Sequence, residues 1–157
     1  MHLSEKKQEL ERNDMIVESF SAEDTFACGY RYGKTAEAGD VFCLYGDLGV
    51  GKTVFTQGFA RGLGILEPVS SPTFTILQIY EEGRLPLYHF DVYRISDPDE
   101  MMEVGFDEYV DGDGVTFIEW AGLIEDILPE KRREVTIEKD LTRGFDYRRI
   151  TIREVEK

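Results

Sequence analysis

The sequence has no long apolar run. None of its 157 residues lie in a stretch that approaches the roughly 20 consecutive apolar residues of a membrane-spanning helix. The amino terminus is charged from Met1 to Asp14 and lacks the apolar segment of a secretory signal. These absences argue against helical membrane spans and export, and we expect a cytoplasmic protein with no membrane partner.

Cysteine is scarce, because the chain has only Cys28 and Cys43. Neither forms a Cys-x-x-Cys pair or lies close to a histidine, so the spacing that is typical of zinc sites is missing. Disulfides are rare in cytoplasmic proteins. The sequence therefore predicts two free buried thiols, one in a helix and one in a buried strand.

Positive charge is also scarce. The chain has 18 Lys and Arg against 32 Asp and Glu, which gives a net charge of −14. Tight binding to nucleic acid depends on Lys and Arg that neutralise phosphates, so direct binding is disfavoured. Residues 95–130 contain no Lys or Arg but twelve acidic residues. We interpret this segment as a solvated acidic face, with a docking surface for a basic partner as the alternative.

What the sequence does contain is the alternation of strands and helices that characterises one α/β domain. We divide the chain into an amino-terminal extension, 1–14, and a domain, 15–157. Helices are predicted at 22–38 and 52–62 and from Asp97 onward, and strands at 15–18, 41–45, 73–80, 85–93, 115–119, 133–139 and 147–153. The continuous apolar runs at 41–45 and 115–119 are typical of strands buried on both faces, whereas the short turn at 81–84 predicts an antiparallel hairpin.

The strongest motif follows the first of these buried runs and opens a predicted helix. It matches G-x-x-x-x-G-K-[ST] and reads Gly46-Asp47-Leu48-Gly49-Val50-Gly51-Lys52-Thr53. In such a loop backbone amides surround phosphate oxygens, the lysine contacts the β- and γ-phosphates, and the hydroxyl binds Mg²⁺. A glycine-rich turn with an incidental lysine is the alternative. The strand–loop–helix context favours a single P-loop NTPase-like domain, with a mixed, mostly parallel sheet, antiparallel hairpin and edge strands, and flanking helices.

A magnesium-dependent site also needs an acid on a neighbouring strand. Asp91 and Glu119 both end apolar strands, and the residues alone do not choose between them: either could hold the metal while the other orients water, or each could be a solvent contact. A hydroxyl of the turn that ends at Thr73 could reach the γ-phosphate, although a plain Ser/Pro turn explains it equally. Mid-strand His89 is interpreted as a hydrogen-bonded core imidazole. Trp120 is interpreted as packing.

Several motifs together resemble the TsaE family (formerly YjeE), the small bacterial ATPases of tRNA threonylcarbamoyladenosine biosynthesis. Besides the loop, the resemblance rests on three short segments, Ser71-Pro72-Thr73-Phe74, His89-Phe90-Asp91-Val92-Tyr93-Arg94 and Ile118-Glu119-Trp120. It covers about residues 15–153. Val54 and Ala121 depart from the residues that are usual in the family, a second threonine and a proline.

The resemblance implies a slow Mg²⁺-dependent ATPase that acts with the partner proteins TsaB and TsaD. The partners transfer threonylcarbamoyl to adenosine 37 of tRNAs that read codons beginning with A, so tRNA is contacted only indirectly. Matching positions imply catalytic roles for Lys52, Asp91 and Thr73, and metal ligation by Thr53 and Glu119. The implied nucleotide-binding residues are Gly46, Asp47, Leu48, Gly49, Val50, Gly51, Lys52, Thr53, Val54 and Trp120.

Two other functions use the same loop. A small-molecule kinase would need an acceptor pocket and commonly an arginine-bearing lid, for which the segment 95–130 offers no arginine. A non-hydrolytic switch would use ATP binding alone to control assembly. A guanine-specific GTPase is disfavoured because the sequence has no Asn-Lys-x-Asp. Arg94 is a candidate for stabilising charge during hydrolysis, with a strand-end salt bridge as the alternative.

Overall fold

The computed structural model describes residues 14–47, 49–70 and 76–156. In chain order the elements are β1 (Asp14–Ser19), α2 (Ala22–Thr35), β2 (Val41–Tyr45), α3 (Lys52–Gly62), β3 (Leu77–Tyr80), β4 (Leu87–Asp91), α4 (Glu100–Glu103), α5 (Phe106–Val110), β5 (Val115–Glu119), η1 (Ala121–Ile127), β6 (Arg132–Lys139), η2 (Leu141–Arg143) and β7 (Arg148–Val155). The predicted division at residue 14 stays a prediction, because residues 1–13 lie outside the described part.

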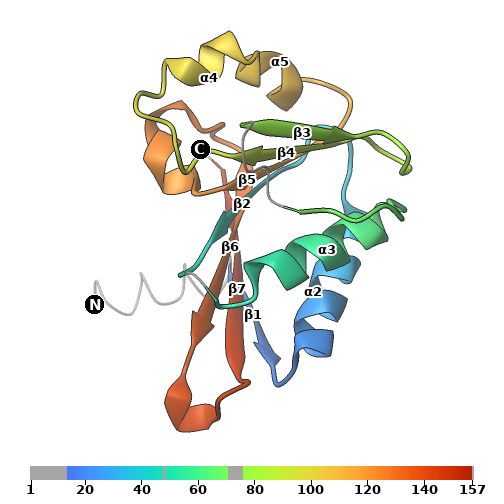
Figure 1. Cartoon of the computed structure of the whole chain (residues 1–157), viewed down its shortest axis with the longest axis vertical. Coiled ribbons are helices and arrows are strands. Elements are labelled where there is room, and N and C mark those ends of the chain that lie inside the picture. The colour runs from blue at the N-terminus through green and yellow to red at the C-terminus, as the bar shows by residue number, and fades with distance from the viewer. Residues whose placement is uncertain (1–13, 48, 71–75, 157) are drawn as a thin grey trace.

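The strands form one seven-stranded sheet in the order β1-β7-β6-β2-β5-β4-β3 (Figure 1). Its centre is parallel, because β2 pairs in parallel with β5 and β6, and β4 with β5. The pairs β1–β7, β6–β7 and β3–β4 are antiparallel. Only β7 and β3 therefore oppose the common direction, which confirms the mixed, mostly parallel sheet with antiparallel edges.

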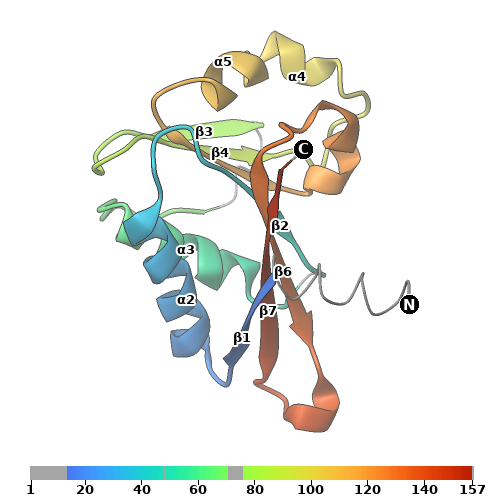
Figure 2. The ribbon, with the colours of Figure 1, turned by 180° about the vertical axis from the view of Figure 1, so that it is seen from behind.

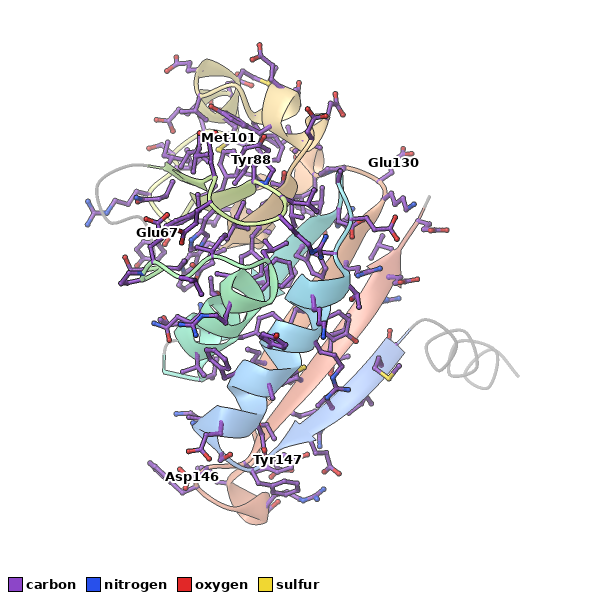
Figure 3. All side chains as sticks on the ribbon, turned by 90° about the vertical axis from the view of Figure 1, so that its right-hand side faces the viewer. Glu67, Tyr88, Met101, Glu130, Asp146 and Tyr147 are labelled. Atoms are coloured by element: carbon purple, nitrogen blue, oxygen red, sulfur yellow. The ribbon has the colours of Figure 1, made fainter. Side chains whose placement is uncertain are left out.

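Alternation of side chains along the buried strands creates a core on each face of the sheet. On β2, Phe42 and Leu44 belong to the core beneath α2 and α3, whereas Val41 and Cys43 belong to the core on the other face. The second core lies beneath η1 and the short helices α4 and α5, where Figure 3 labels Met101 and Tyr88. Two covered faces explain why the predicted strand at 41–45 is a continuous apolar run.

Helices α2 and α3 cross at a contact made by glycines. A Cβ on Gly29 would collide with the carbonyl oxygen of Phe55, and one on Gly33 with that of Phe59. Gly58 and Gly62 of α3 are equally close to the backbone of α2. The spacing Gly-x-x-x-Gly on both helices places the small residues on one face, so the two backbones touch directly.

Two helix boundaries differ from the prediction. Helix α2 ends at Thr35 and not at residue 38, because the Arg84 guanidinium donates hydrogen bonds to the carbonyls of Gly33, Lys34 and Ala36. Helix α4 begins at Glu100 and not at Asp97. The Asp97 carboxylate accepts from the Asp99 amide and the Glu100 carboxylate accepts from the Asp97 amide, so a capped turn precedes the helix.

Both cysteines are free and buried, as predicted. Burial raises the pKa of the Cys28 thiol to about 11 and that of Cys43 to about 12, so both stay as unreactive thiols near neutral pH. Among the described residues no helix combines the length and hydropathy that crossing a membrane requires.

The glycine contact predicts that Gly29→Ala destabilises the protein. Alanine favours an ordinary helix over glycine by about 1 kcal/mol. Here the added methyl must push the two helices apart, and we expect a net loss of about 2 kcal/mol in the free energy of unfolding. Urea denaturation measures it, with the exposed Lys34→Ala on the same helix as the near-neutral control. A stabilised Gly29→Ala would contradict the close crossing.

Candidate functional site

The predicted phosphate loop joins the carboxyl end of β2 to the amino terminus of α3. Gly46, Gly49 and Gly51 have backbone φ angles of +148°, +80° and +103°, which disfavour any residue with a Cβ. Gly46 has a second constraint, because a Cβ there would lie 2.8 Å from the Ile137 carbonyl oxygen. Glycines are thus required for the shape of the loop, and not only for flexibility.

The amino terminus of α3 is prepared for an anion. Gly51 occupies the N-cap position without a side-chain cap, and the first turn contains no acidic residue. Capping carboxylates are therefore absent from the positive end of the helix dipole, which leaves that end to a ligand. Thr53 is exposed on this first turn, and Val54 beside it is half-buried.

Lys52 is mostly buried, and its ammonium group lies over an aromatic ring. Its side-chain Nζ is 4.2 Å from the centroid of the Trp120 ring. Trp120 has φ +63° and is the one non-glycine residue with a positive φ among those the structure describes. The ring also packs against Tyr93, with 4.7 Å between centroids. The prediction that Trp120 has a packing role is therefore confirmed, and its ring packs against the loop lysine, Lys52, as well as against Tyr93.

Asp91 and Glu119 lie next to each other. They are register partners at the carboxyl ends of the parallel strands β4 and β5, so their side chains share one face of the sheet. That face is the one beneath α3, because Phe117, two residues before Glu119, packs against Phe59 of the helix. The sequence left open which acid belongs to the site, and the fold brings both to the edge that carries the loop.

The two acids differ in burial. Of the twelve acidic residues in 95–130, only Glu119 is buried, with 4% of its surface exposed, and most of the others are solvated as predicted. Asp91 is half-buried. Burial raises the pKa of the Asp91 carboxyl, and the Glu119 carboxylate raises it further, whereas the Tyr93 amide and the charge of Lys52 lower it.

His89 supports Glu119 from the neighbouring strand. Its Nε2 is 2.7 Å from Oε2 of Glu119, and its ring is fully buried edge-on to Phe117. The prediction of a hydrogen-bonded core imidazole is confirmed. Its partner, however, is the predicted metal ligand, and such hydrogen bonds orient ligating carboxylates.

The chemistry of these residues fits a magnesium ion bound together with phosphates. In the described part of the chain, no group of three or more His, Cys, Asp or Glu could hold a metal by itself. Magnesium usually takes one or two protein ligands and completes its shell with phosphate oxygens and water. Thr53 and Glu119 are oxygen ligands of the type it prefers, and His89 holds the carboxylate.

The structure leaves three sequence predictions without further support. Leu48 and Thr73 lie outside the described residues, so their predicted contacts with phosphate stay predictions. Arg94 is exposed beyond the end of β4.

Sequence reasoning missed the glycine contact between α2 and α3, although the two Gly-x-x-x-Gly spacings were a readable signal.

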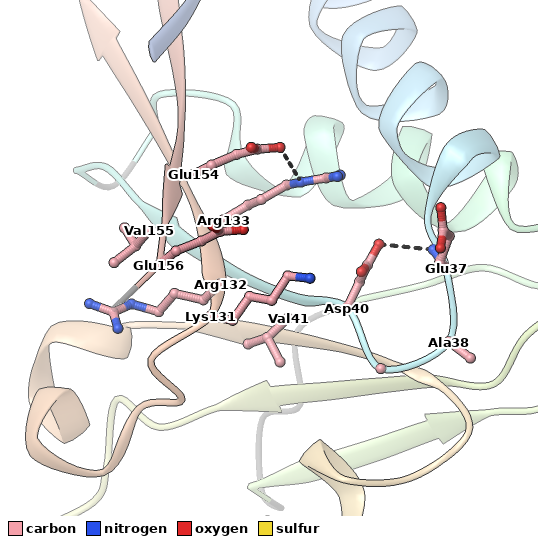
Figure 4. A pocket seen from close by; sticks show the side chains of 11 residues that line it. Glu37, Ala38, Asp40, Val41, Lys131, Arg132, Arg133, Glu154, Val155 and Glu156 are labelled. Carbon is pink, nitrogen blue, oxygen red and sulfur yellow. Dashed lines mark hydrogen bonds and ion pairs between the residues drawn. The ribbon is translucent and has the colours of Figure 1, made fainter. Parts of the chain in front are cut away.

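Two cavities adjoin the loop, and a third lies at the opposite end of the central strands, where β2 begins. One of about 280 Å³ is lined by Lys52 and Trp120, and one of about 530 Å³ lies between the loop and β6. The third, of about 320 Å³, surrounds the start of β2 (Figure 4). Among its lining residues Arg133 pairs with Glu154, at 3.4 Å between Nε and Oε1. Ligands of parallel sheets bind at the carboxyl ends of the strands, so the loop-side cavities form the candidate site.

The raised pKa of Asp91 predicts that Asp91→Asn stabilises the folded protein at neutral pH. A carboxyl whose pKa is higher in the folded than in the unfolded state costs stability as pH rises from its ordinary value of 3.8 through the raised value. The advantage of the variant should therefore grow with pH over this window and level off above it. Urea denaturation between pH 4 and 8 measures it, with the exposed Asp126→Asn as control. An advantage that does not change with pH would contradict the prediction.

The chain is similar to known proteins in both sequence and fold. Residues 19–150 match the family described as "Threonylcarbamoyl adenosine biosynthesis protein TsaE". The tRNA threonylcarbamoyladenosine biosynthesis protein TsaE of Bacillus subtilis (strain 168) is 51% identical over 129 residues, which cover 82% of this chain and 78% of the relative. That of Treponema pallidum (strain Nichols) is 47% identical over 112 residues, 71% of this chain and 82% of the relative.

The fold has a solved counterpart as well. A crystal structure of YdiB from Bacillus subtilis superimposes with a TM-score of 0.75 at 42% identity, and the match covers 90% of this chain and 86% of that one. The match of the family over most of the chain, the curated relatives and the shared P-loop NTPase-like fold lead to one conclusion: the chain belongs to the TsaE family.

Proposed function

We propose that this protein binds ATP with Mg²⁺, hydrolyses it slowly, and thereby serves the threonylcarbamoyl modification of adenosine 37 in tRNAs that read codons beginning with A. The observation that carries the proposal is the convergence of the loop with Asp91 and Glu119 at one edge of the sheet. The names of the curated relatives support the tRNA pathway. This role implies a cytoplasmic protein.

Each residue of the site has a task in this proposal. The loop amides and Lys52 bind the β- and γ-phosphates and stabilise the charge that develops during hydrolysis. Thr53 and Glu119 would hold Mg²⁺, which would supply positive charge to offset that of the phosphates. Asp91 orients the attacking water; its raised pKa and its position beside Glu119 suit a group that handles a proton. Phosphate draws the Lys52 ammonium group away from the Trp120 ring.

The charge of the surface supports a division of labour with the partners. The exposed acids of 95–130 leave the protein poorly suited to grip tRNA itself. We therefore assign tRNA binding and the transfer of threonylcarbamoyl to TsaB and TsaD, and we assign the acidic face to contact with them. Hydrolysis by the isolated chain would be slow, because no arginine is among the described residues that line the two loop-side cavities. A partner arginine could add about 10³–10⁵ in rate.

A small-molecule kinase is the second candidate, because the cavity of about 280 Å³ beside Lys52 is large enough for part of an acceptor. Leu44, Tyr45 and Leu123 give this cavity apolar walls. Transfer of labelled phosphate from ATP to a metabolite, and not to water, would establish that activity. A non-hydrolytic assembly switch uses the same residues as the ATPase and is distinguished by the experiment below.

The experiment separates binding from turnover. ATP affinity and hydrolysis are measured for the wild type, Lys52→Ala and Asp91→Asn, with and without TsaB and TsaD. We expect Lys52→Ala to lose nucleotide affinity, and Asp91→Asn to keep it while turnover falls by about 10²–10⁴. The exposed Asp146→Asn lies outside the acidic face, and as the control it should behave as wild type. Partners should raise the wild-type rate.

Three results would count against the proposal. If the wild type does not bind ATP, the site assignment is wrong. If partners bind but never change hydrolysis, the accessory role fails and the kinase test follows. If Asp91→Asn abolishes hydrolysis yet supports full tRNA modification in a reconstituted reaction, ATP binding suffices and the protein is a switch.

A further inference from the structure

The β6–β7 hairpin lies against the outside of the phosphate loop. It extends beyond the body of the molecule (Figures 1 and 2), and Asp146 and Tyr147 mark its far end in Figure 3. The close approach of the Ile137 carbonyl to Gly46 is one contact between them. The loop is therefore bounded by α3 on one side and by this hairpin on the other.

A single arginine of the hairpin reaches the loop backbone. Arg148, the first residue of β7, donates from Nε to the carbonyl oxygen of Val50 at 2.9 Å. Its Nη1 donates to the carbonyls of Phe145 at 2.9 Å and Tyr147 at 2.7 Å. The half-buried guanidinium thus bridges three main-chain carbonyls, and none of the ion pairs found among the described residues involves it.

The Val50 carbonyl belongs to the peptide that also carries the Gly51 amide of the phosphate loop, so its orientation sets the direction of that amide. This peptide is planar and trans, so the C=O and the N–H point in opposite directions. A donor that holds the Val50 carbonyl on the hairpin side therefore turns the Gly51 N–H away from the hairpin. Gly51 has φ +103° and no side chain, so its own conformation does little to fix this peptide plane.

We propose that Arg148 is a positioning residue for the phosphate-binding loop. Its guanidinium fixes the Val50–Gly51 peptide so that the loop amide faces the phosphate and the carbonyl faces away from it. Hydrogen bonds from a charged donor are stronger than neutral ones, which suits a contact that must resist rotation of the peptide. The same guanidinium ties the loop to the hairpin end through Phe145 and Tyr147. This inference rests on the proposed nucleotide binding.

The test compares two arginines of β7. Arg148→Met keeps an unbranched apolar stem and removes the guanidinium with its donors. Arg153→Met removes the same charge from the same strand, at a half-exposed position whose ion pair with Asp14 spans 3.7 Å. The Kd for Mg·ADP is measured by calorimetry, which needs no turnover. We expect a roughly tenfold weaker Kd for Arg148→Met, equivalent to about 1.4 kcal/mol, and less than a twofold change for Arg153→Met.

Chemical rescue separates positioning from a general structural defect. Added methylguanidinium, at concentrations that leave the urea unfolding curve unchanged, should restore Mg·ADP affinity to Arg148→Ala but not to Arg153→Ala. Arg148→Lys should keep only part of the wild-type affinity for Mg·ADP, because one ammonium group cannot reproduce the planar fork of guanidinium donors.

The outcomes distinguish this inference from the proposed function. If the wild type fails to bind Mg·ADP, nucleotide binding itself is wrong. If the wild type binds and Lys52→Ala does not, while Arg148→Met binds as tightly as wild type, only the positioning role is overturned. Equal losses in Arg148→Met and Arg153→Met would also overturn it, since charge alone would then explain the effect.

Discussion

The contact between the backbones of α2 and α3 is the constraint on which the site depends. Glycines at 29, 33, 58 and 62 let the two helices touch without intervening side chains. Phe59 of α3 in turn packs against Phe42 and Phe117 of the sheet. The amino terminus of α3 then lies at the carboxyl end of β2, and the loop between them has little freedom. The position of the phosphate site therefore depends on the glycine contact between α2 and α3, which lies about two turns after the start of α3.

The parallel register supplies the second half of the site. Because β4 and β5 run side by side and end together, Asp91 and Glu119 become neighbours at the edge that carries the loop. The chain carries a net charge of −14, yet the first turn of α3 has no acid and Glu119 alone is buried among the acids of 95–130. An acidic protein can bind an anion in this way, because the local arrangement of amides, Lys52 and metal ligands outweighs the distant surface charge.

Local signals predicted much of this arrangement. The apolar runs at 41–45 and 115–119 specify buried strands, and the glycine-rich loop with its lysine is readable from spacing alone. Long-range contacts were not readable. His89 and Glu119 are 30 residues apart, and Arg148 and Val50 are 98 apart. The early end of α2 has the same cause, because the capping guanidinium of Arg84 comes from 48 to 51 residues away. No local propensity contains such information.

The most direct test of the phosphate site uses Trp120, the single tryptophan of the chain. Its ring lies 4.2 Å from Nζ of Lys52, so phosphate that draws the ammonium group away must change the surroundings of the indole. Titration with Mg·ATP, followed by tryptophan fluorescence and in parallel by calorimetry, should give a saturable change in emission with the same Kd by both methods. Lys52→Ala should abolish the change. Tight binding by calorimetry with unaltered emission would contradict the site as described, because the nucleotide would then bind away from Lys52.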